Sequence, residues 1–163
     1  MKIIPNNSFF SEIEKFISAG ESVTIMVKGR SMMPLLRNGR DAVVLSPVDT
    51  KNLQAGQIVL FRHNDRHLLH RIVKTDGENL VIQGDGTRTT ENATRADVVG
   101  VVTAIVRWHR KQIPLPNKWE KRYFRVWCLL KPFRRYLLWA FRKISRIFFL
   151  FRKRFGMTNM VKN

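Results

Sequence analysis

The stretch SVTIMVKGRSMMPLLRNGRDAVVLS, residues 22–46, combines two strand-like runs with a turn-rich segment between them. In its first part Val23, Ile25 and Val27 occupy alternate positions, which is the period of a half-buried β-strand. A second apolar run, DAVVLS, closes the stretch after the turn-forming residues RNGR. The pattern therefore predicts two strands joined by a loop, and this loop carries Ser31.

Short strand-like runs fill most of the following sixty residues. They are QIVLFR, LLHRIVK, NLVIQ and ADVVGVVTAIV, and turn-forming segments separate them. Gly100 within the last run predicts a bulge or a close backbone approach. One helix, with a single apolar face, is expected before the strands, over residues 7–18. Regular short spacing favours a mostly β body of roughly six strands, a barrel or coiled sheet, over βαβ units.

Charge divides the chain into two parts. Residues 1–106 hold 13 Lys and Arg against 11 Asp and Glu, whereas residues 107–163 hold 17 against 1. We therefore expect a helix over 1–20, a β domain over 21–110 and a basic tail over 111–163. So strong an asymmetry predicts an anionic partner for the tail, either a membrane surface or nucleic acid.

The cysteine and histidine content predicts a fold without disulfide bonds or a structural metal ion. Cys128 is the only cysteine, so no internal disulfide is expected, and no Cys/His spacing is typical of a zinc site. We expect no metal and no cofactor. Polar residues interrupt the first twenty positions, so no cleaved export signal is predicted.

Ser31 raises the question of nucleophilic catalysis, since a serine hydroxyl needs an adjacent base. His70 lies inside an apolar run, where packing can hold an imidazole in place. The other histidines nearby, His63 and His67, read as surface residues. Lys28 and Lys74, both on strand-like segments, are the remaining candidates for a base.

A catalytic histidine usually has a carboxylate that fixes its tautomer. The segment IQGDGTRTTEN offers Asp85 and Glu91 in a glycine-bounded loop. Spacing alone does not choose between the two.

The boxes GRSMMPLL, NGRD, HRIV, QGDG and VVGVVTAI, in this order over residues 22–106, resemble the motif set of the signal peptidase clan of membrane serine proteases. The resemblance implies that Ser31 is the nucleophile. Most bacterial members have lysine before the arginine of the third box, but the endoplasmic-reticulum and archaeal type has histidine, which matches His70. The acid of the fourth box then matches Asp85, our preferred orienting carboxylate, and Glu91 remains the rival.

The neighbours of Ser31 match the family only in part. Gly29 stands where members often have a serine that donates to the oxyanion, so backbone N–H groups such as that of Ser31 would form the hole. The resemblance places Met32, Met33 and Pro34 along the substrate groove, with the two methionines as wall or core residues. From the first residues of this sequence we expect no counterpart of the clan's N-terminal membrane anchor.

Self-cleaving repressors of the LexA type share the serine box and are a competing interpretation. They need a lysine base, a DNA-binding domain in front and a scissile Ala-Gly well upstream. Ala19-Gly20 lies only about ten residues before Ser31. We therefore prefer an enzyme that cleaves other chains.

The tail shows helical spacing of apolar residues from Trp119 onward. Five cations between Phe133 and Phe151 argue against a membrane span, because each is costly at the bilayer centre. We expect an amphipathic helix that lies in the membrane interface, its aromatic side chains segregated from its basic ones. The expected membrane-binding residues are Trp127, Phe133, Arg134, Arg135, Trp139, Phe141, Arg142 and Phe148. Single-stranded nucleic acid, or packing on the body or a second subunit, is the alternative use of this helix.

Together these patterns predict a serine endopeptidase of signal-peptidase type, held peripherally at a bacterial or archaeal inner membrane. Precursor or secretory peptides are the expected substrates, and a partner protein can supply specificity. The alternative from another class is a non-catalytic module on the same fold that binds membrane or nucleic acid.

Overall fold

The computed structural model describes residues 6–107 and 111–130, together with 133, 136, 139, 140 and 143. The chain forms two compact units, Met1–Arg125 and Val126–Asn163. The boundary expected after residue 110 lies within the first of these units, which carries the β-sheet and the first part of the second helix.

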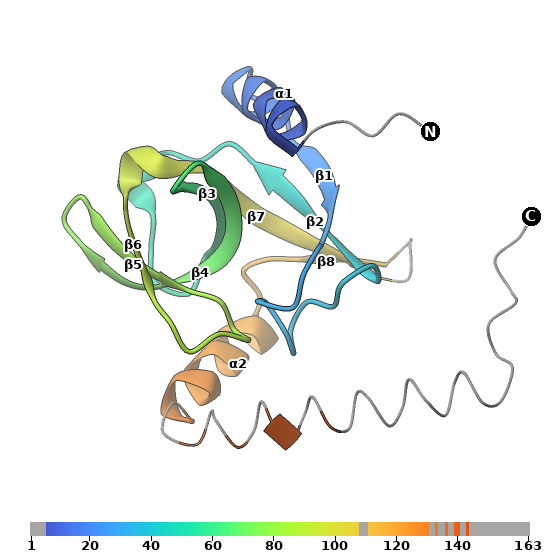
Figure 1. The fold of residues 1–163 in the computed structure, drawn as a ribbon, viewed down its shortest axis with the longest axis vertical. Helices are drawn as coiled ribbons and strands as arrows, with labels where there is room; N and C mark the ends of the chain where they lie inside the picture. The colour runs from blue at the N-terminus through green and yellow to red at the C-terminus, as the bar shows by residue number, and fades with distance from the viewer. Residues whose placement is uncertain are drawn as a thin grey trace, which may run out of the picture. The chain divides into compact units, whose positions relative to one another are not determined.

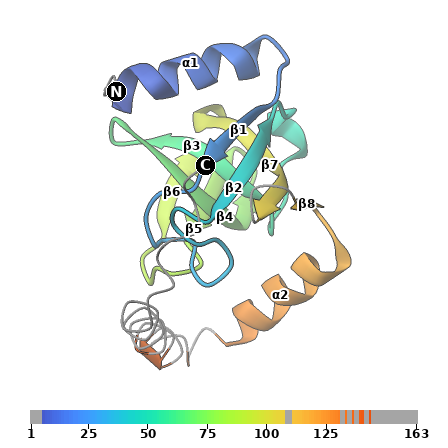
Figure 2. The same ribbon diagram turned by 90° about the vertical axis from the view of Figure 1, so that its right-hand side faces the viewer.

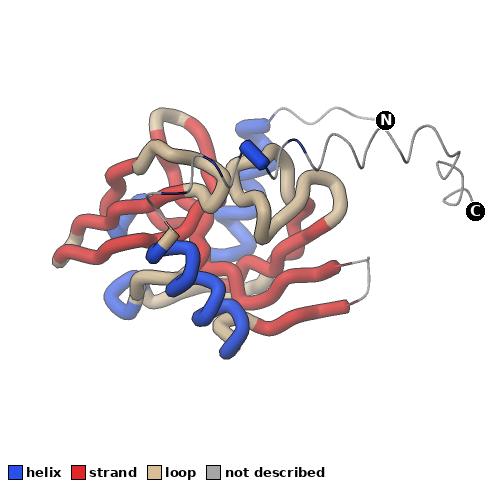
Figure 3. The backbone as a smooth tube through the Cα atoms, turned by 90° about the horizontal axis from the view of Figure 1, so that it is seen from below, coloured by secondary structure: helices blue, strands red, loops and turns tan. Residues whose placement is uncertain are grey.

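The first unit is built from one antiparallel sheet with a helix before it and a helix after it (Figure 1). In chain order the elements are α1 (Asn6–Ser18), β1 (Val23–Met26), β2 (Asp41–Ser46), η1 (Thr50–Asn52), β3 (Ile58–His63), β4 (Arg66–Asp76), β5 (Asn79–Gln83), β6 (Glu91–Thr94), η2 (Arg95–Asp97), β7 (Val98–Arg107), β8 (Lys111–Pro114) and α2 (Lys118–Leu129). The strands lie in the order β1-β2-β7-β3-β4-β5-β6, and β8 pairs with β7. Figure 3 shows how the sheet coils on itself rather than lying flat.

The predicted fold class is confirmed: the body is mostly β, with one short helix in front. The sheet has eight strands in the described part of the chain, more than the expected six. Sequence patterns missed two strands, β6 and β8. Their sequences, ENAT and KQIP, hold too few apolar residues to alternate, whereas β1, which is equally short, lies in a run that alternates.

Gly100 has the close backbone approach that its place in a strand predicted. A Cβ there would lie 3.1 Å from the carbonyl oxygen of Ser46 on β2. The register between β3 and β7 also shifts at the neighbouring pair, between Leu60 and Phe61. A larger residue at position 100 would therefore push β7 away from β2.

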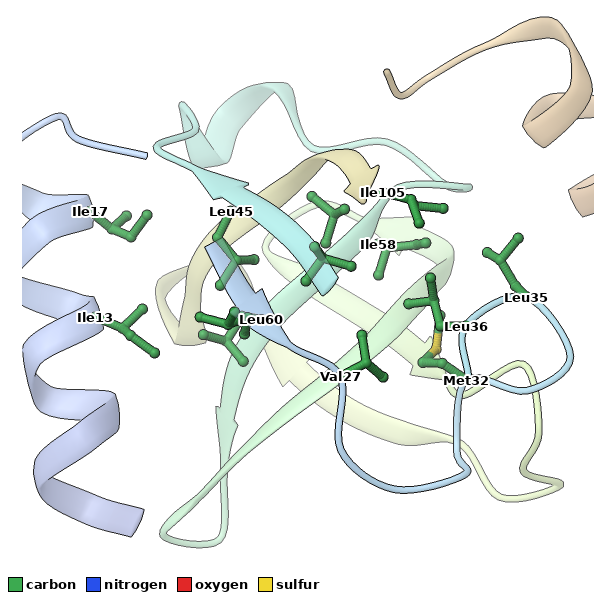
Figure 4. Packing of buried hydrophobic residues seen from close by; sticks show 13 residues of the cluster. Ile13, Ile17, Val27, Met32, Leu35, Leu36, Leu45, Ile58, Leu60 and Ile105 are labelled. Atoms are coloured by element: carbon green, nitrogen blue, oxygen red, sulfur yellow. The ribbon is translucent and has the colours of Figure 1, made fainter. Parts of the chain in front are cut away.

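Two hydrophobic clusters fill the interior, and β3 contributes to both. Ile58 and Leu60 pack into the first cluster, and the alternate residues Val59 and Phe61 pack into the second. All four are at most 2% exposed, which explains why this strand reads as a continuous apolar run. Figure 4 shows the first cluster with Ile13 of α1 at one edge. Burying each such side chain contributes about 1.5–3 kcal/mol.

Helix α1 lies beside the sheet (Figure 2). Polar and aromatic contacts hold it there in addition to its apolar face. Glu14 Oε1 lies 2.7 Å from His67 Nε2 on β4. The ring of Phe10 stacks on the imidazole of His67 with 4.5 Å between centroids. His67, expected at the surface, is instead half-buried and holds α1 on the sheet.

Candidate active site

Ser31 lies in the loop that joins β1 to β2, and backbone hydrogen bonds close this loop at its base. The N–H of Val27 donates to the carbonyl of Asp41 at 2.9 Å, and that of Gly39 donates to the carbonyl of Val27 at 3.1 Å. Gly29 has a φ of +88°, a conformation that side-chain-bearing residues rarely adopt. The loop thus has a defined shape, and Ser31 is half-buried within it.

The carboxylate of Asp41, the first residue of β2, binds the last residues of the same loop. It is fully buried and accepts hydrogen bonds from the Arg37 N–H at 2.9 Å and from the Arg40 guanidinium at 2.7 and 2.6 Å. Burial alone would raise the pKa of Asp41, but these hydrogen bonds and the positive charges of Arg40 and Arg107 outweigh it and lower the pKa below its ordinary value. Asp41 therefore stabilises the fold in its ionised form.

We expect the Asp41→Asn variant to be less stable than the wild type at neutral pH, by an amount that shrinks on acidification. A depressed pKa in the folded state contributes stability above the unfolded pKa and loses it as the pH falls through the folded value. Urea unfolding of both proteins from pH 7 to pH 2 measures the difference. A gap that stays constant below about pH 4 would contradict the role of this carboxylate.

His70 lies on β4 and is only 4% exposed. Its Nδ1 is 3.1 Å from Oε2 of Glu91, the first residue of β6. The ring of Phe61, which is fully buried, lies 6.2 Å from the imidazole, centroid to centroid. A carboxylate at Nδ1 fixes the tautomer in which Nε2 is free to accept a proton.

Nε2 of His70 faces the loop that carries Ser31, across Gly84. A Cβ on Gly84 would lie 2.5 Å from the Ser31 carbonyl oxygen and 3.0 Å from His70 Nε2. Both atoms therefore crowd the same point from different elements. Among the described residues no hydrogen bond joins the Ser31 hydroxyl to His70, and such contacts are often loose before substrate binds.

The box QGDG owes both of its glycines to this close packing. The N–H of Gly86 donates to the Ser31 carbonyl at 2.6 Å. A Cβ on Gly86 would come within 2.5 Å of the Arg30 carbonyl oxygen. Only glycine at 84 and 86 lets the two loops lie against each other.

In the structure the carboxylate beside His70 is that of Glu91 and not that of the preferred Asp85. Asp85 is 2% exposed, and each of its carboxylate oxygens accepts a hydrogen bond from the Arg71 guanidinium at 3.0 Å. Neighbouring residues on a strand point to opposite faces, so His70 and Arg71 reach different partners. The rival residue, Glu91, is the one that contacts His70.

The other candidate residues fall into separate places. Met32 is 2% exposed and packs in the first hydrophobic cluster, so it is a core residue rather than a groove wall. Met33 and Pro34 are half-buried, and Gly29 is exposed. Lys28 is also exposed, and Lys74 Nζ lies 3.6 Å from Asp76 on the surface. Within the described ranges no group of His, Cys, Asp and Glu has the arrangement of a metal site.

Sequence reasoning missed a contribution from α2. The buried carboxylate of Glu120 accepts a hydrogen bond from Arg71, and Asn117 caps the helix by accepting the Glu120 N–H at 2.8 Å. Glu120 is the only acidic residue after position 106. A lone acidic residue in a basic segment, three residues after a possible N-cap asparagine, was the sequence signal that could have indicated this contact.

Part of the expected membrane-binding set can be located. Phe133 is 61% exposed and Trp139 59%, while Trp127 is half-buried. Arg134, Arg135, Phe141, Arg142 and Phe148 lie outside the described residues. No helix in the described part of the chain is both long and apolar enough to cross a bilayer.

Comparison with known proteins places the chain in a family. Residues 3–103 match the model of the family described as Peptidase S24-like. No curated protein matches the chain. At the level of the wider LexA-like and signal-peptidase-like serine peptidases, the resemblance seen in the motifs is confirmed, but the matched family is not signal peptidase I. With most of its body inside this match, the chain belongs to the Peptidase S24-like family.

Proposed function

We propose that this protein is a serine endopeptidase that works through Ser31, His70 and Glu91. The observation that carries the proposal is the placement of His70, whose Nδ1 contacts Glu91 at 3.1 Å while its Nε2 faces the loop of Ser31. This is the arrangement that a histidine base needs to activate a serine hydroxyl.

In the proposed reaction the Ser31 oxygen attacks the scissile carbonyl carbon, and His70 Nε2 takes the hydroxyl proton. The tetrahedral oxyanion is stabilised by backbone N–H groups such as that of Ser31. His70 then returns the proton to the leaving amine as the C–N bond breaks, leaving an ester on Ser31. Water hydrolyses this acyl-enzyme with His70 again as the base, which restores the serine.

We further propose that the enzyme acts at an anionic membrane surface, on precursor or secretory peptides. Support comes from the basic tail and from exposed apolar side chains in and after α2, namely Trp119, Val126, Leu129, Phe133, Tyr136 and Trp139. Large apolar groups beside Lys and Arg favour the boundary between headgroups and acyl chains. The Nζ of Lys143 over the Trp139 ring, at 4.5 Å, is an example of the two kinds lying together.

The test of the peptidase is a comparison of new protein N-termini in membranes that contain either the wild-type chain or Ser31→Ala. We expect a set of termini that only the wild type produces, and this set would also reveal the cleavage rule. Identical sets would count against catalysis. A serine-dependent terminus at Gly20 of the chain itself would instead favour self-cleavage.

The membrane location is tested separately by flotation of the full-length chain with vesicles. We expect binding to vesicles that contain anionic lipid and much weaker binding to purely neutral ones, with a further loss at high salt. Absence of binding to both kinds would contradict the membrane proposal. It would leave the peptidase proposal unaffected.

A further inference from the structure

Arg71 is the centre of a buried ionic cluster next to the proposed base. Its side chain is 1% exposed and lies between the carboxylates of Asp85 and Glu120. It also donates to the Gly56 carbonyl at 2.6 Å, and its guanidinium lies 5.4 Å from the ring centroid of Phe124. Burial alone would lower the pKa of Arg71, but the two carboxylates outweigh it and raise the pKa above the ordinary value.

The two carboxylates come from very different parts of the chain. Asp85 belongs to the loop after β5, inside the segment that matches the family, whereas Glu120 lies on α2, beyond the end of that match at residue 103. Glu120 is held by the helix start, where its N–H bonds to Asn117. A buried carboxylate without a partner would be costly, so Glu120 and Arg71 fix each other.

The two chain neighbours of Asp85, Gly84 and Gly86, pack directly against the loop that carries Ser31. Gly86 donates its N–H to the Ser31 carbonyl at 2.6 Å, and a Cβ on Gly84 would lie close to both that carbonyl oxygen and His70 Nε2. Any rotation of the Asp85 backbone would therefore change the place of Ser31 relative to His70. Arg71 prevents this rotation by binding both Asp85 oxygens.

We propose that Glu120 is a positioning residue for the active site: through Arg71 and Asp85 it holds the loop of Gly84 and Gly86 against the loop of Ser31. The start of α2 thus contributes to the geometry of the active site and is not only the beginning of a membrane-binding tail. The kinetic part of this inference rests on the proposed peptidase function.

The kinetic test compares Glu120→Ala, Glu120→Gln and the control Lys121→Gln, an exposed change one residue further along α2. The substrate is a fluorogenic peptide built on the cleavage site found from the new N-termini. For Glu120→Ala we expect kcat to fall roughly 10- to 100-fold with KM nearly unchanged, because misplacement of the reacting groups affects the chemical step. Glu120→Gln keeps an acceptor for Arg71 and should recover part of this loss, and Lys121→Gln should match the wild type.

Hydrogen exchange tests the same link without any substrate. In Glu120→Ala we expect the amide of Gly86 to exchange at least about tenfold faster, while amides of β2 and β7 keep their protection. Uniformly faster exchange would show a general loss of stability, and unchanged exchange at Gly86 would show no link; either result overturns the inference. If Ser31→Ala still cleaves the peptide, the peptidase proposal fails, and the exchange result still decides the role of Glu120.

Discussion

The Ser31→Ala and His70→Ala variants should each lose at least about 10⁴-fold in kcat on a peptide that the wild type cleaves. The double variant should be no worse than either single one. Without Ser31 there is no acyl-enzyme, and without His70 nothing removes the hydroxyl proton, so either loss disables the same step. Steady-state kinetics of the three variants measure this.

The matched control for this prediction is His67→Ala, on the same strand. His67 stacks on Phe10 and contacts Glu14, away from the proposed chemistry, so its removal should leave kcat unchanged. Substantial activity in His70→Ala would return attention to Lys28 and Lys74. Loss of that residual activity on replacing either lysine would then identify a lysine base.

Substitutions of Asp85 and Glu91 should affect different properties, the first stability and the second catalysis. Asp85→Asn should lower the free energy of unfolding by about 3–5 kcal/mol, because it removes one of the two charged partners of a buried arginine. Glu91→Gln should change stability far less but lower kcat by about 10²- to 10⁴-fold, since a neutral amide neither stabilises an imidazolium nor enforces the tautomer. Urea unfolding and kinetics of both variants test the assignment.

The opposite pattern would contradict it. A stable Asp85→Asn whose loss of kcat is as large as that of His70→Ala, well beyond the roughly 10- to 100-fold expected from misplacement, would make Asp85 the orienting residue after all. A Glu91→Gln variant with normal kcat would remove Glu91 from the mechanism.

Much of the fold could be predicted because burial leaves a periodic trace in the sequence. The runs 41–46 and 79–83 match β2 and β5 residue for residue. The helix at 7–18 and the close approach at Gly100 were also predicted. The strands β6 and β8 hold too few apolar residues to leave such a trace, so the segment around Glu91, expected as a loop, is a strand in the structure.

The site was predictable in its residue types but not in its pairing. Ser31 and His70 stand in recognisable boxes, whereas the choice between Asp85 and Glu91 depends on which way each side chain points. That direction follows from Arg71, which takes Asp85, and from the pairing of Glu91 with Ile82 on β5. Neither fact can be read from spacing along the chain.

The role of α2 was missed because the basic character of the tail suggested a single solvated or membrane-bound segment. One acidic residue among many basic ones carries little weight in a composition. In the folded chain it lies 4% exposed against a buried arginine. A single acidic residue in an otherwise basic segment is thus a useful indication that its helix packs on the β domain.

The residue that carries the covalent intermediate identifies the nucleophile. Wild-type protein is mixed with an ester analogue of the cleaved peptide, quenched in acid and digested, and the adduct is located by mass spectrometry. We expect an acyl group on Ser31, absent from Ser31→Ala and formed far more slowly in His70→Ala. An adduct on a different residue, or turnover that persists in Ser31→Ala, would contradict the assignment of Ser31 as the nucleophile.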